Sequence, residues 1–104
     1  MTRTIGIGLA GFGTVGAGVY KNLLKNGALL EQRIGVTFDI RKIAVRDLSK
    51  ARDVVAPSEL FTASADDLLE DPSIDVVVEL MGGVDIPLRF VKRAIEAGKI
   101  VVTG

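Results

Sequence analysis

The 104-residue sequence predicts an α/β fold built around a parallel sheet, and three observations support this class. Short apolar runs rich in β-branched residues alternate with segments of helical periodicity. A glycine-rich turn directly follows the first apolar run. The length suits one hydrophobic core that needs no disulfide. Right-handed crossovers join such strands into a parallel sheet, and we expect the order 3-2-1-4-5 of a doubly wound, Rossmann-type sheet that stops after about five strands.

Two strands flank a helical region in the first half of the chain. The first strand is apolar and ends in glycines, as is typical of a buried parallel strand. Val15, Val19 and Leu23 recur at helical spacing, whereas Asn26-Gly27 is expected to interrupt the helix. The expected elements are a strand over residues 4–10, a helix from residue 14, a second helical piece over residues 28–33 and a strand over residues 36–45.

The second half of the chain adds three strands, each preceded by helical or turn sequence. Ser64 and Asp67 have the spacing of a capping box, and Asp71-Pro72 ends the helix that they begin. The expected elements are helical turns over residues 47–55, a strand over 59–63, a helix over 64–70, a strand over 75–80, a helix from near residue 87 to a cap at residue 98, and a strand over 99–103. The apolar face of the last helix is expected to contain Leu88, Val91, Ala94 and Ile95.

Residues 6–16 match the dinucleotide-binding pattern G-x-G-x-x-G in two overlapping registers, one from Gly6 and one from Gly11. A phosphate-binding turn must follow a strand and open a helix, because a helix N-terminus presents free N–H groups and partial positive charge. The first register leaves only residues 1–5 for the strand, and its third glycine precedes another turn. The second register places a full strand before the turn and a helix after it. We therefore assign the cofactor turn to the second register.

The second register gives each glycine a separate role. Gly11 permits the tight turn, Gly13 lets a pyrophosphate touch the backbone, and Gly16 lets the helix pack closely on the strand. Gly6 and Gly8 lie on one strand face, where a neighbouring element can come close. The alternative, that all these glycines serve packing alone, does not explain their spacing. The expected cofactor contacts in the turn are Gly11, Phe12, Gly13, Thr14, Val15 and Gly16.

The end of the second strand indicates which dinucleotide is preferred. An acidic residue there binds the ribose 2′-hydroxyl of NAD, whereas an arginine accommodates the 2′-phosphate of NADP. Arg46 stands at this position with Asp47 after it, about 30 residues beyond Gly16, where a spacing of about 20 is usual. We expect NADP to be preferred and NAD to be the second cofactor. The alternative is that Arg46 is an ordinary solvated arginine. Lys50 and Arg52 are interpreted as solvated surface residues.

The end of the fourth strand supplies further candidates, because open α/β sheets bind ligands at this edge. Gly82 and Gly83 allow the backbone to approach the ribose or nicotinamide, and a plain strand-to-helix turn is the alternative. Glu79 is interpreted as a hydrogen-bonded carboxylate that orients the loop, with a catalytic base as the alternative. Thr103 lies at the matching edge of the fifth strand. We assign no catalytic residue.

Composition excludes several classes of function. Thirteen basic and thirteen acidic residues give a formal net charge of zero, so no nucleic-acid or membrane partner is expected. The lack of cysteine and histidine removes Cys/His metal sites, thiol nucleophiles and histidine-based triads. No run approaches the roughly 18 apolar residues of a membrane span. Six glycines within residues 4–20 argue against a signal peptide, and we expect a cytoplasmic protein.

Four segments together resemble the N-terminal cofactor domain of homoserine dehydrogenase. They are GFGTVGAGV at residues 11–19, IAVRD at 43–47, IDVVVELMGG at 74–83 and AIEAGKIVVTG at 94–104. The resemblance implies a single domain over residues 1–104 that binds NADP or NAD. It implies an enzyme that interconverts L-homoserine and L-aspartate 4-semialdehyde, on the route to threonine, methionine and isoleucine.

The resemblance also indicates what the sequence lacks. In that family a segment similar to T-A-N-K follows the fifth strand and places a lysine beside nicotinamide and substrate. This sequence has Gly104 where alanine is commoner, and it stops before the lysine. The substrate and dimerisation domain is absent too, so we expect a fragment of a homo-oligomeric enzyme that binds cofactor without turnover. Two alternatives remain open: a regulatory nucleotide-sensing module, and the cofactor domain of a related dehydrogenase such as aspartate dehydrogenase.

Overall fold

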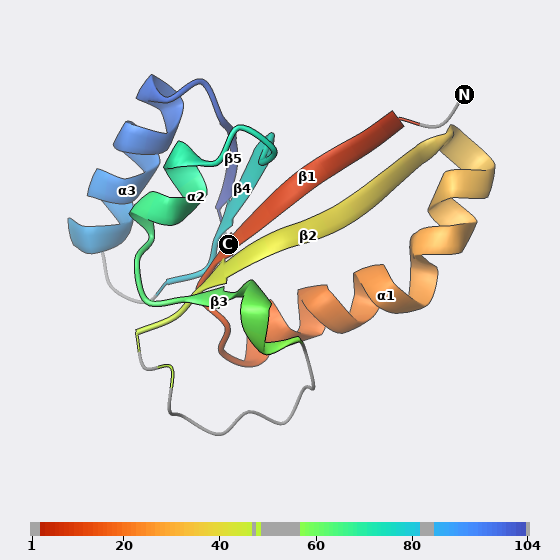
Figure 1. The fold of residues 1–104 in the computed structure, drawn as a ribbon, viewed down its shortest axis with the longest axis horizontal. Coiled ribbons are helices and arrows are strands. Elements are labelled where there is room, and N and C mark those ends of the chain that lie inside the picture. The colour runs from red at the N-terminus through yellow and green to blue at the C-terminus, as the bar shows by residue number, and fades with distance from the viewer. Residues whose placement is uncertain (1–2, 47, 49–56, 82–84, 104) are drawn as a thin grey trace.

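The computed structural model describes residues 3–46, 48, 57–81 and 85–103. Its centre is a five-stranded parallel sheet in the order β3-β2-β1-β4-β5 (Figure 1), which confirms the predicted fold class and strand order. The strands are β1 (Arg3–Ala10), β2 (Val36–Ala44), β3 (Phe61–Thr62), β4 (Val76–Glu79) and β5 (Ile100–Thr103). The helices are α1 (Thr14–Ile34), α2 (Asp66–Glu70) and α3 (Asp85–Glu96), with a short 3-10 helix, η1 (Ser58–Leu60).

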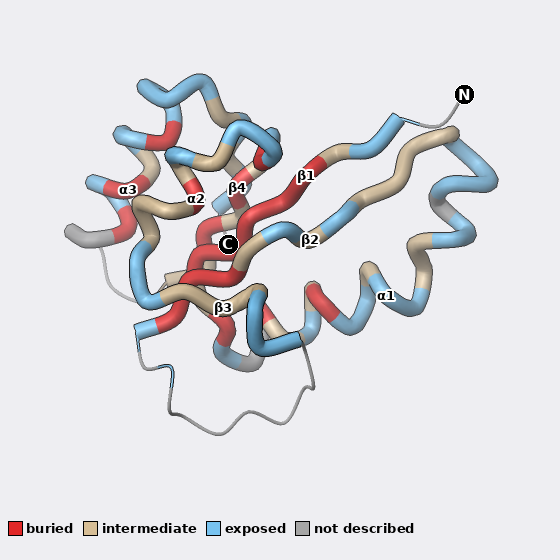
Figure 2. Tube along the Cα trace, viewed as in Figure 1, coloured by how far each residue is buried: buried red, intermediate tan, exposed pale blue. Residues whose placement is uncertain are grey.

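The helices cover opposite faces of the sheet, because successive side chains of a strand point to opposite sides. Leu9 of β1 packs with Tyr20 of α1 in one core cluster. On the other face, Ala10 packs with Leu68 of α2 and Phe90 of α3. Figure 2 shows that buried residues follow the central strand β1 and the helix sides that face it. The sheet is therefore the middle of three layers.

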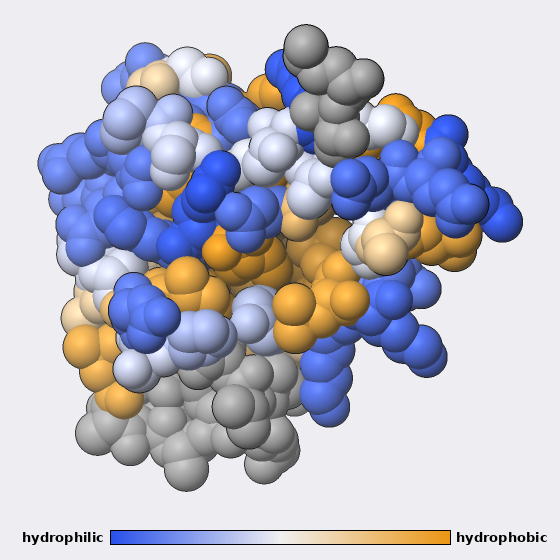
Figure 3. Space-filling view, turned by 45° about the vertical axis from the view of Figure 1, so that its right-hand side comes forward, coloured by the Kyte–Doolittle hydropathy of each residue, from blue (hydrophilic) through white to orange (hydrophobic). Residues whose placement is uncertain are grey.

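Helix α1 covers its face of the sheet only in part. Ile5, Phe38 and Leu23 pack against the core cluster on this side but remain partly exposed. Figure 3, in which the α1 side of the molecule is turned toward the viewer, shows hydrophobic residues gathered in the middle of the surface between hydrophilic ones.

Gly6 and Gly8 share the face of β1 that carries α2, and both allow the close approach predicted for them. A Cβ on Gly6 would lie 1.8 Å from the carbonyl oxygen of Ser73. A Cβ on Gly8 would lie 3.2 Å from side-chain carbons of Ile74 and Leu68. At Gly6 no side chain fits without moving the backbone, so this glycine is a packing requirement.

Strand β2 contains one extra residue. Ile7 of β1 pairs with Ile40, but the next residue of β1 pairs with Lys42, so Arg41 is left over as a bulge. As a result, Ile40 and Ile43 both face α1 although they are separated by an odd number of positions. The bulge explains why the alternation of apolar residues breaks within this strand.

The predicted interruption of the first helix is wrong: α1 is continuous over 21 residues. The side-chain amide of Asn26 donates hydrogen bonds to Asn22 one turn earlier, to its carbonyl oxygen at 3.2 Å and its Oδ1 at 2.9 Å. A Cβ on Gly27 would meet nothing within 4 Å, so this glycine costs only its lower helix propensity, about 1 kcal/mol. The helix ends at Gly35, which has a left-handed φ of 67°. None of the described helices is long and apolar enough to cross a membrane.

The elements around β3 are shorter than predicted. Helix η1 takes the first residues of the expected third strand, which leaves only Phe61–Thr62. Helix α2 ends where expected, but it begins at Asp66 and has no capping box. The carboxylate of Asp67 instead accepts a hydrogen bond from the Thr62 hydroxyl at 2.5 Å. The tertiary contact with β3 thus replaces the predicted local cap.

The buried face of helix α3 overlaps the predicted one only in part. Ala94 is buried and Val91 is half-buried as predicted, whereas Leu88 and Ile95 are 65% and 62% exposed and Phe90 is buried instead. Residues 90 and 94 are also at helical spacing, and the large ring of Phe90 gains more by burial than Leu88 would. The helix ends before Gly98, whose φ of 80° confirms the predicted cap.

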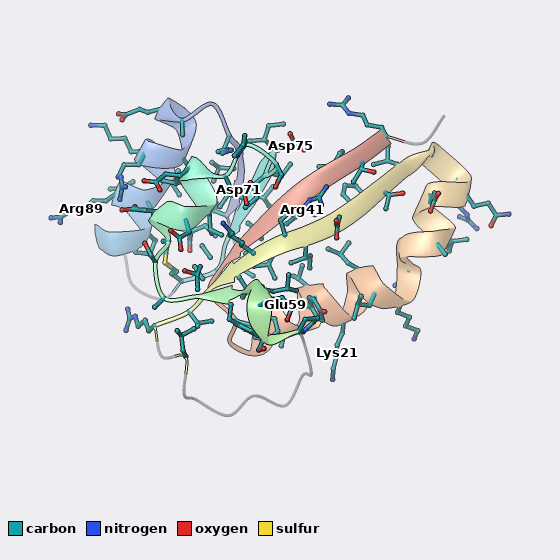
Figure 4. The ribbon with its side chains drawn as sticks, in the orientation of Figure 1. Lys21, Arg41, Glu59, Asp71, Asp75 and Arg89 are labelled. Carbon is teal, nitrogen blue, oxygen red and sulfur yellow. The ribbon has the colours of Figure 1, made fainter. Side chains whose placement is uncertain are left out.

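Polar side chains join β4 and β5 to their neighbours at the amino-terminal edge of the sheet, where Figure 4 labels Asp71 and Asp75. The Nζ of Lys99 donates to the carbonyl oxygens of Asp71 at 2.7 Å and Ile74 at 2.6 Å. The carboxylate of Asp75 accepts the N–H of Gly6 at 2.9 Å. Charged side chains therefore stabilise this edge by satisfying backbone groups.

Candidate functional site

The turn after β1 has a backbone conformation that favours glycine. Gly11 has a φ of 106°, which side chains of L-residues rarely adopt. Its N–H donates to the carbonyl oxygen of Ala44 in β2 at 2.9 Å. A Cβ at this position would lie 3.1 Å from the carbonyl oxygen of Leu80, just after β4. The turn is therefore confined between β2 and β4.

The start of α1 presents open backbone donors. Gly13 is its N-cap, with no side-chain cap hydrogen bond and no acidic residue in the first turn, to which Thr14 and Val15 belong. A Cβ on Gly13 would meet nothing within 4 Å. The first N–H groups of a helix have no partner inside the helix and carry partial positive charge. The N-terminus of α1 can therefore accept an anion against its backbone.

Gly16 and Phe12 hold the turn against the core. A Cβ on Gly16 would lie 2.6 Å from the carbonyl oxygen of Gly11, so glycine lets α1 begin this close to the turn. Phe12 is 8% exposed and meets Tyr20 and Phe61 edge to face, with ring centroids 6.0 and 5.3 Å apart. The Phe12 side chain therefore belongs to the core, and only its backbone is available to a ligand.

Strand β4 ends beside this turn. The N–H of Leu80 donates to the carbonyl oxygen of Ala10 at 2.9 Å. Glu79, the last residue of the strand, is 5% exposed, and its Oε2 accepts the N–H of Met81 at 2.6 Å. The structure thus agrees with the interpretation of Glu79 as a hydrogen-bonded carboxylate at the start of the loop. An engaged, buried carboxylate is poorly placed to act as a base.

Arg46 follows the end of β2 at the same edge and is exposed. It lies two residues after Ala44, whose carbonyl binds Gly11. No ion pair joins Arg46 to any carboxylate within the described part of the chain. The helical turns predicted for residues 47–55 lie outside the described residues, except for Leu48, which is in a turn.

Two more predicted positions remain. Thr103 pairs with Glu79 in the parallel register of β5 and β4, and it is exposed at their carboxyl ends. Gly82 and Gly83 lie outside the described residues. The glycine turn, Arg46 and Thr103 thus all lie at the carboxyl edge of the sheet, where β1, β2 and β5 end (Figure 1).

Sequence reasoning missed Leu80. Its carbonyl oxygen lies 3.1 Å from the Cβ position of Gly11, and its Cδ1 lies 3.7 Å from that of Gly16. It forms the wall against which the turn packs. The signal was its place as the last residue of an apolar run that ends at the ligand edge. No cluster of acidic residues that suits a metal ion occurs among the described residues.

Comparison with known sequences gives a consistent result. The family model described as homoserine dehydrogenase, NAD binding domain, matches residues 11–104. The chain is 48% identical over 99 residues to homoserine dehydrogenase of Corynebacterium glutamicum, and 39% identical over 101 residues to that of Bacillus subtilis. These alignments cover 95% and 97% of this chain but only 22% and 23% of the relatives. The chain therefore spans less than a quarter of their length.

Solved structures agree with the sequence relatives. The crystal structure of S. aureus homoserine dehydrogenase at pH 6.0 matches with a TM-score of 0.93 and 32% identity, over 99% of this chain and 27% of that one. The enzyme from Thiobacillus denitrificans matches with a TM-score of 0.87 and 39% identity, over 98% of this chain and 23% of that one. In sequence and in fold, this chain belongs to the family of homoserine dehydrogenase NAD-binding domains.

Proposed function

We propose that residues 1–104 form one domain that binds a nicotinamide dinucleotide with its pyrophosphate at the N-terminus of α1. The observation that carries the proposal is the open position at Gly13, the N-cap, where a Cβ would meet nothing within 4 Å. Backbone N–H groups and the partial positive charge of the helix favour an anion there. The residues proposed to line the pyrophosphate are Gly11, Phe12, Gly13, Thr14, Val15 and Gly16.

The remaining contacts are proposed on either side of the turn, where the strand order reverses and open α/β sheets bind ligands. Arg46, after β2, would pair with the 2′-phosphate, so NADP would be preferred over NAD. Gly82, Gly83 and Thr103, after β4 and on β5, would approach the ribose and nicotinamide. The exposure of Arg46, without an ion-pair partner among the described residues, supports its part of the proposal.

We further propose that a longer protein carrying this domain interconverts L-homoserine and L-aspartate 4-semialdehyde, in the cytoplasm and as a homo-oligomer. The nicotinamide supplies the hydride chemistry. This domain binds and orients the dinucleotide. The carboxylate of Glu79 accepts a backbone hydrogen bond and takes no part in the chemical step. Substrate binding and proton transfer would need residues beyond these, since the chain matches about a quarter of each relative.

Binding and turnover are expected to separate in the 104-residue chain. Calorimetric titration with NADPH and NADH should show saturable binding, while homoserine oxidation assayed in parallel should stay at background. Homoserine oxidation by the purified chain would contradict the proposed division of roles. If neither dinucleotide binds, the proposal that this domain holds a cofactor site is contradicted.

Gly13→Val is expected to lower dinucleotide affinity, whereas Gly8→Ala is expected to lower thermal stability. Valine would place methyl groups in the open space at the N-cap, so dinucleotide affinity should fall at least about tenfold, or 1.4 kcal/mol, with little change in melting temperature. Alanine at position 8 would press on Ile74 and Leu68 at 3.2 Å, so the melting temperature should fall while affinity holds. Calorimetry and thermal melts measure both. The reverse pattern would move the cofactor turn to the first glycine register.

Arg46→Ala is expected to weaken NADPH binding by one to two orders of magnitude and to leave NADH binding almost unchanged. Hydrogen bonds to charged groups contribute roughly 1.5–3 kcal/mol, and about 1.4 kcal/mol corresponds to tenfold in affinity. Added salt should also weaken NADPH binding more than NADH binding. Arg89→Ala is the matched control, because Arg89 projects outward from α3 (Figure 4). Equal losses for both dinucleotides would return Arg46 to an ordinary surface role.

A further inference from the structure

We propose that Glu79 is a positioning residue for the cofactor turn and that it acts through the peptide between Leu80 and Met81. The inference rests on the proposed dinucleotide site and deepens it. It assigns the buried carboxylate to the geometry of the glycine turn, with no direct contact to cofactor or substrate.

Glu79 is the only buried charged side chain in the part of the chain that the structure describes. It follows Val76, Val77 and Val78 and precedes Leu80, so Glu79 is the one residue of this run that is not apolar. Burial of an ionised carboxylate is unfavourable unless hydrogen bonds replace its water. An apolar side chain would fill the same space without that cost. A glutamate here therefore indicates a task other than packing.

The hydrogen bond of Glu79 defines that task. Its Oε2 accepts the N–H of Met81 at 2.6 Å, a short distance typical of a charge-assisted bond. In the preceding peptide, the N–H of Leu80 donates to the carbonyl oxygen of Ala10 at 2.9 Å. The two bonds fix the peptide planes on either side of Leu80, so the Leu80–Met81 peptide cannot rotate freely.

This peptide is the wall of the cofactor turn. A Cβ on Gly11 would lie 3.1 Å from the carbonyl oxygen of Leu80 and 3.4 Å from the nitrogen of Met81. The Cδ1 of Leu80 also lies 3.7 Å from the Cβ position of Gly16, at the start of α1. Rotation of the peptide would either press its oxygen into Gly11 or open a gap beside it. The carboxylate therefore supports the turn that presents the N–H groups of α1.

Three variants separate this role from general stability. Glu79→Leu keeps a buried side chain but removes the acceptor, and we expect affinity for both NADH and NADPH to fall about tenfold, as for the loss of one hydrogen bond to a charged group. Glu79→Gln keeps an acceptor oxygen and should stay within about threefold of the unmodified chain, rescuing most of the loss. Leu68→Ala is the control: it truncates a fully buried side chain of α2, in the core cluster on the face of the sheet away from α1, so it should lower the melting temperature without changing affinity.

Affinities are compared at a temperature where every variant is folded, and amide hydrogen exchange at Met81 is followed without ligand. Should Glu79→Leu fail to fold, Glu79→Gln decides between the outcomes. If the Met81 amide stays protected and affinity is retained, the proposal is supported. If the amide loses its protection while affinity is unchanged, the proposal is overturned. Normal affinity in folded Glu79→Leu, or a loss in Leu68→Ala equal to that in Glu79→Leu, also overturns it. If the unmodified chain binds neither dinucleotide, the proposed function fails separately, while exchange at Met81 still tests the hydrogen bond.

Discussion

The abrupt reversal of the chain between β1 and α1 is the constraint on which the rest of the structure depends. Gly11 adopts a φ of 106° while its N–H bonds to β2, and a Cβ on Gly16 would come within 2.6 Å of the Gly11 carbonyl oxygen. These contacts place the first turn of α1 directly beyond the end of the central strand. A side chain at either position would move the helix away from the sheet and its N-terminus away from the edge where β2 and β4 end.

The two edges of the sheet perform different tasks. At the amino-terminal edge, Lys99 and Asp75 bond to backbone groups of neighbouring segments, and such bonds to charged groups contribute roughly 1.5–3 kcal/mol each. At the carboxyl edge, the N-cap of α1 has no side chain that would occupy its donors. Charged side chains thus stabilise the opposite edge, and the edge of the proposed site can keep backbone donors available. Glu79 is the exception, because its charged side chain binds a backbone N–H beside the proposed site.

Much of the architecture was predictable because its signals are local. Strand order follows from the alternation of strands and helices, and the choice of glycine register follows from the length of strand before each turn. The continuity of α1 through Asn26 involves a local contact, a hydrogen bond to Asn22 one turn earlier. The other errors share one cause, since each depends on a contact between segments that a single sequence does not reveal. Phe90 is buried in place of Leu88 on α3. The bulge at Arg41 likewise depends on pairing with β1.

The candidate site was predictable to a similar degree. The conformational and packing roles of Gly11 and Gly16 follow from the motif and from the strand before it. The support from Leu80 was not predictable, because it comes from a strand far away in the sequence that pairs with β1 only in the fold. The buried position of Phe12 was hidden for the same reason, since its partner Phe61 lies on β3.

The central claim is that the first turn of α1 binds the pyrophosphate through its backbone, and the amide spectrum of the labelled chain tests it most directly. Titration with NADPH in a two-dimensional nitrogen–proton correlation experiment follows every backbone N–H separately. The account predicts the largest shift changes at Gly13, Thr14, Val15 and Gly16, with the amides of Asp75 and Lys99 at the opposite edge almost unmoved. Saturable binding that shifts the opposite edge and leaves these four amides in place would contradict it.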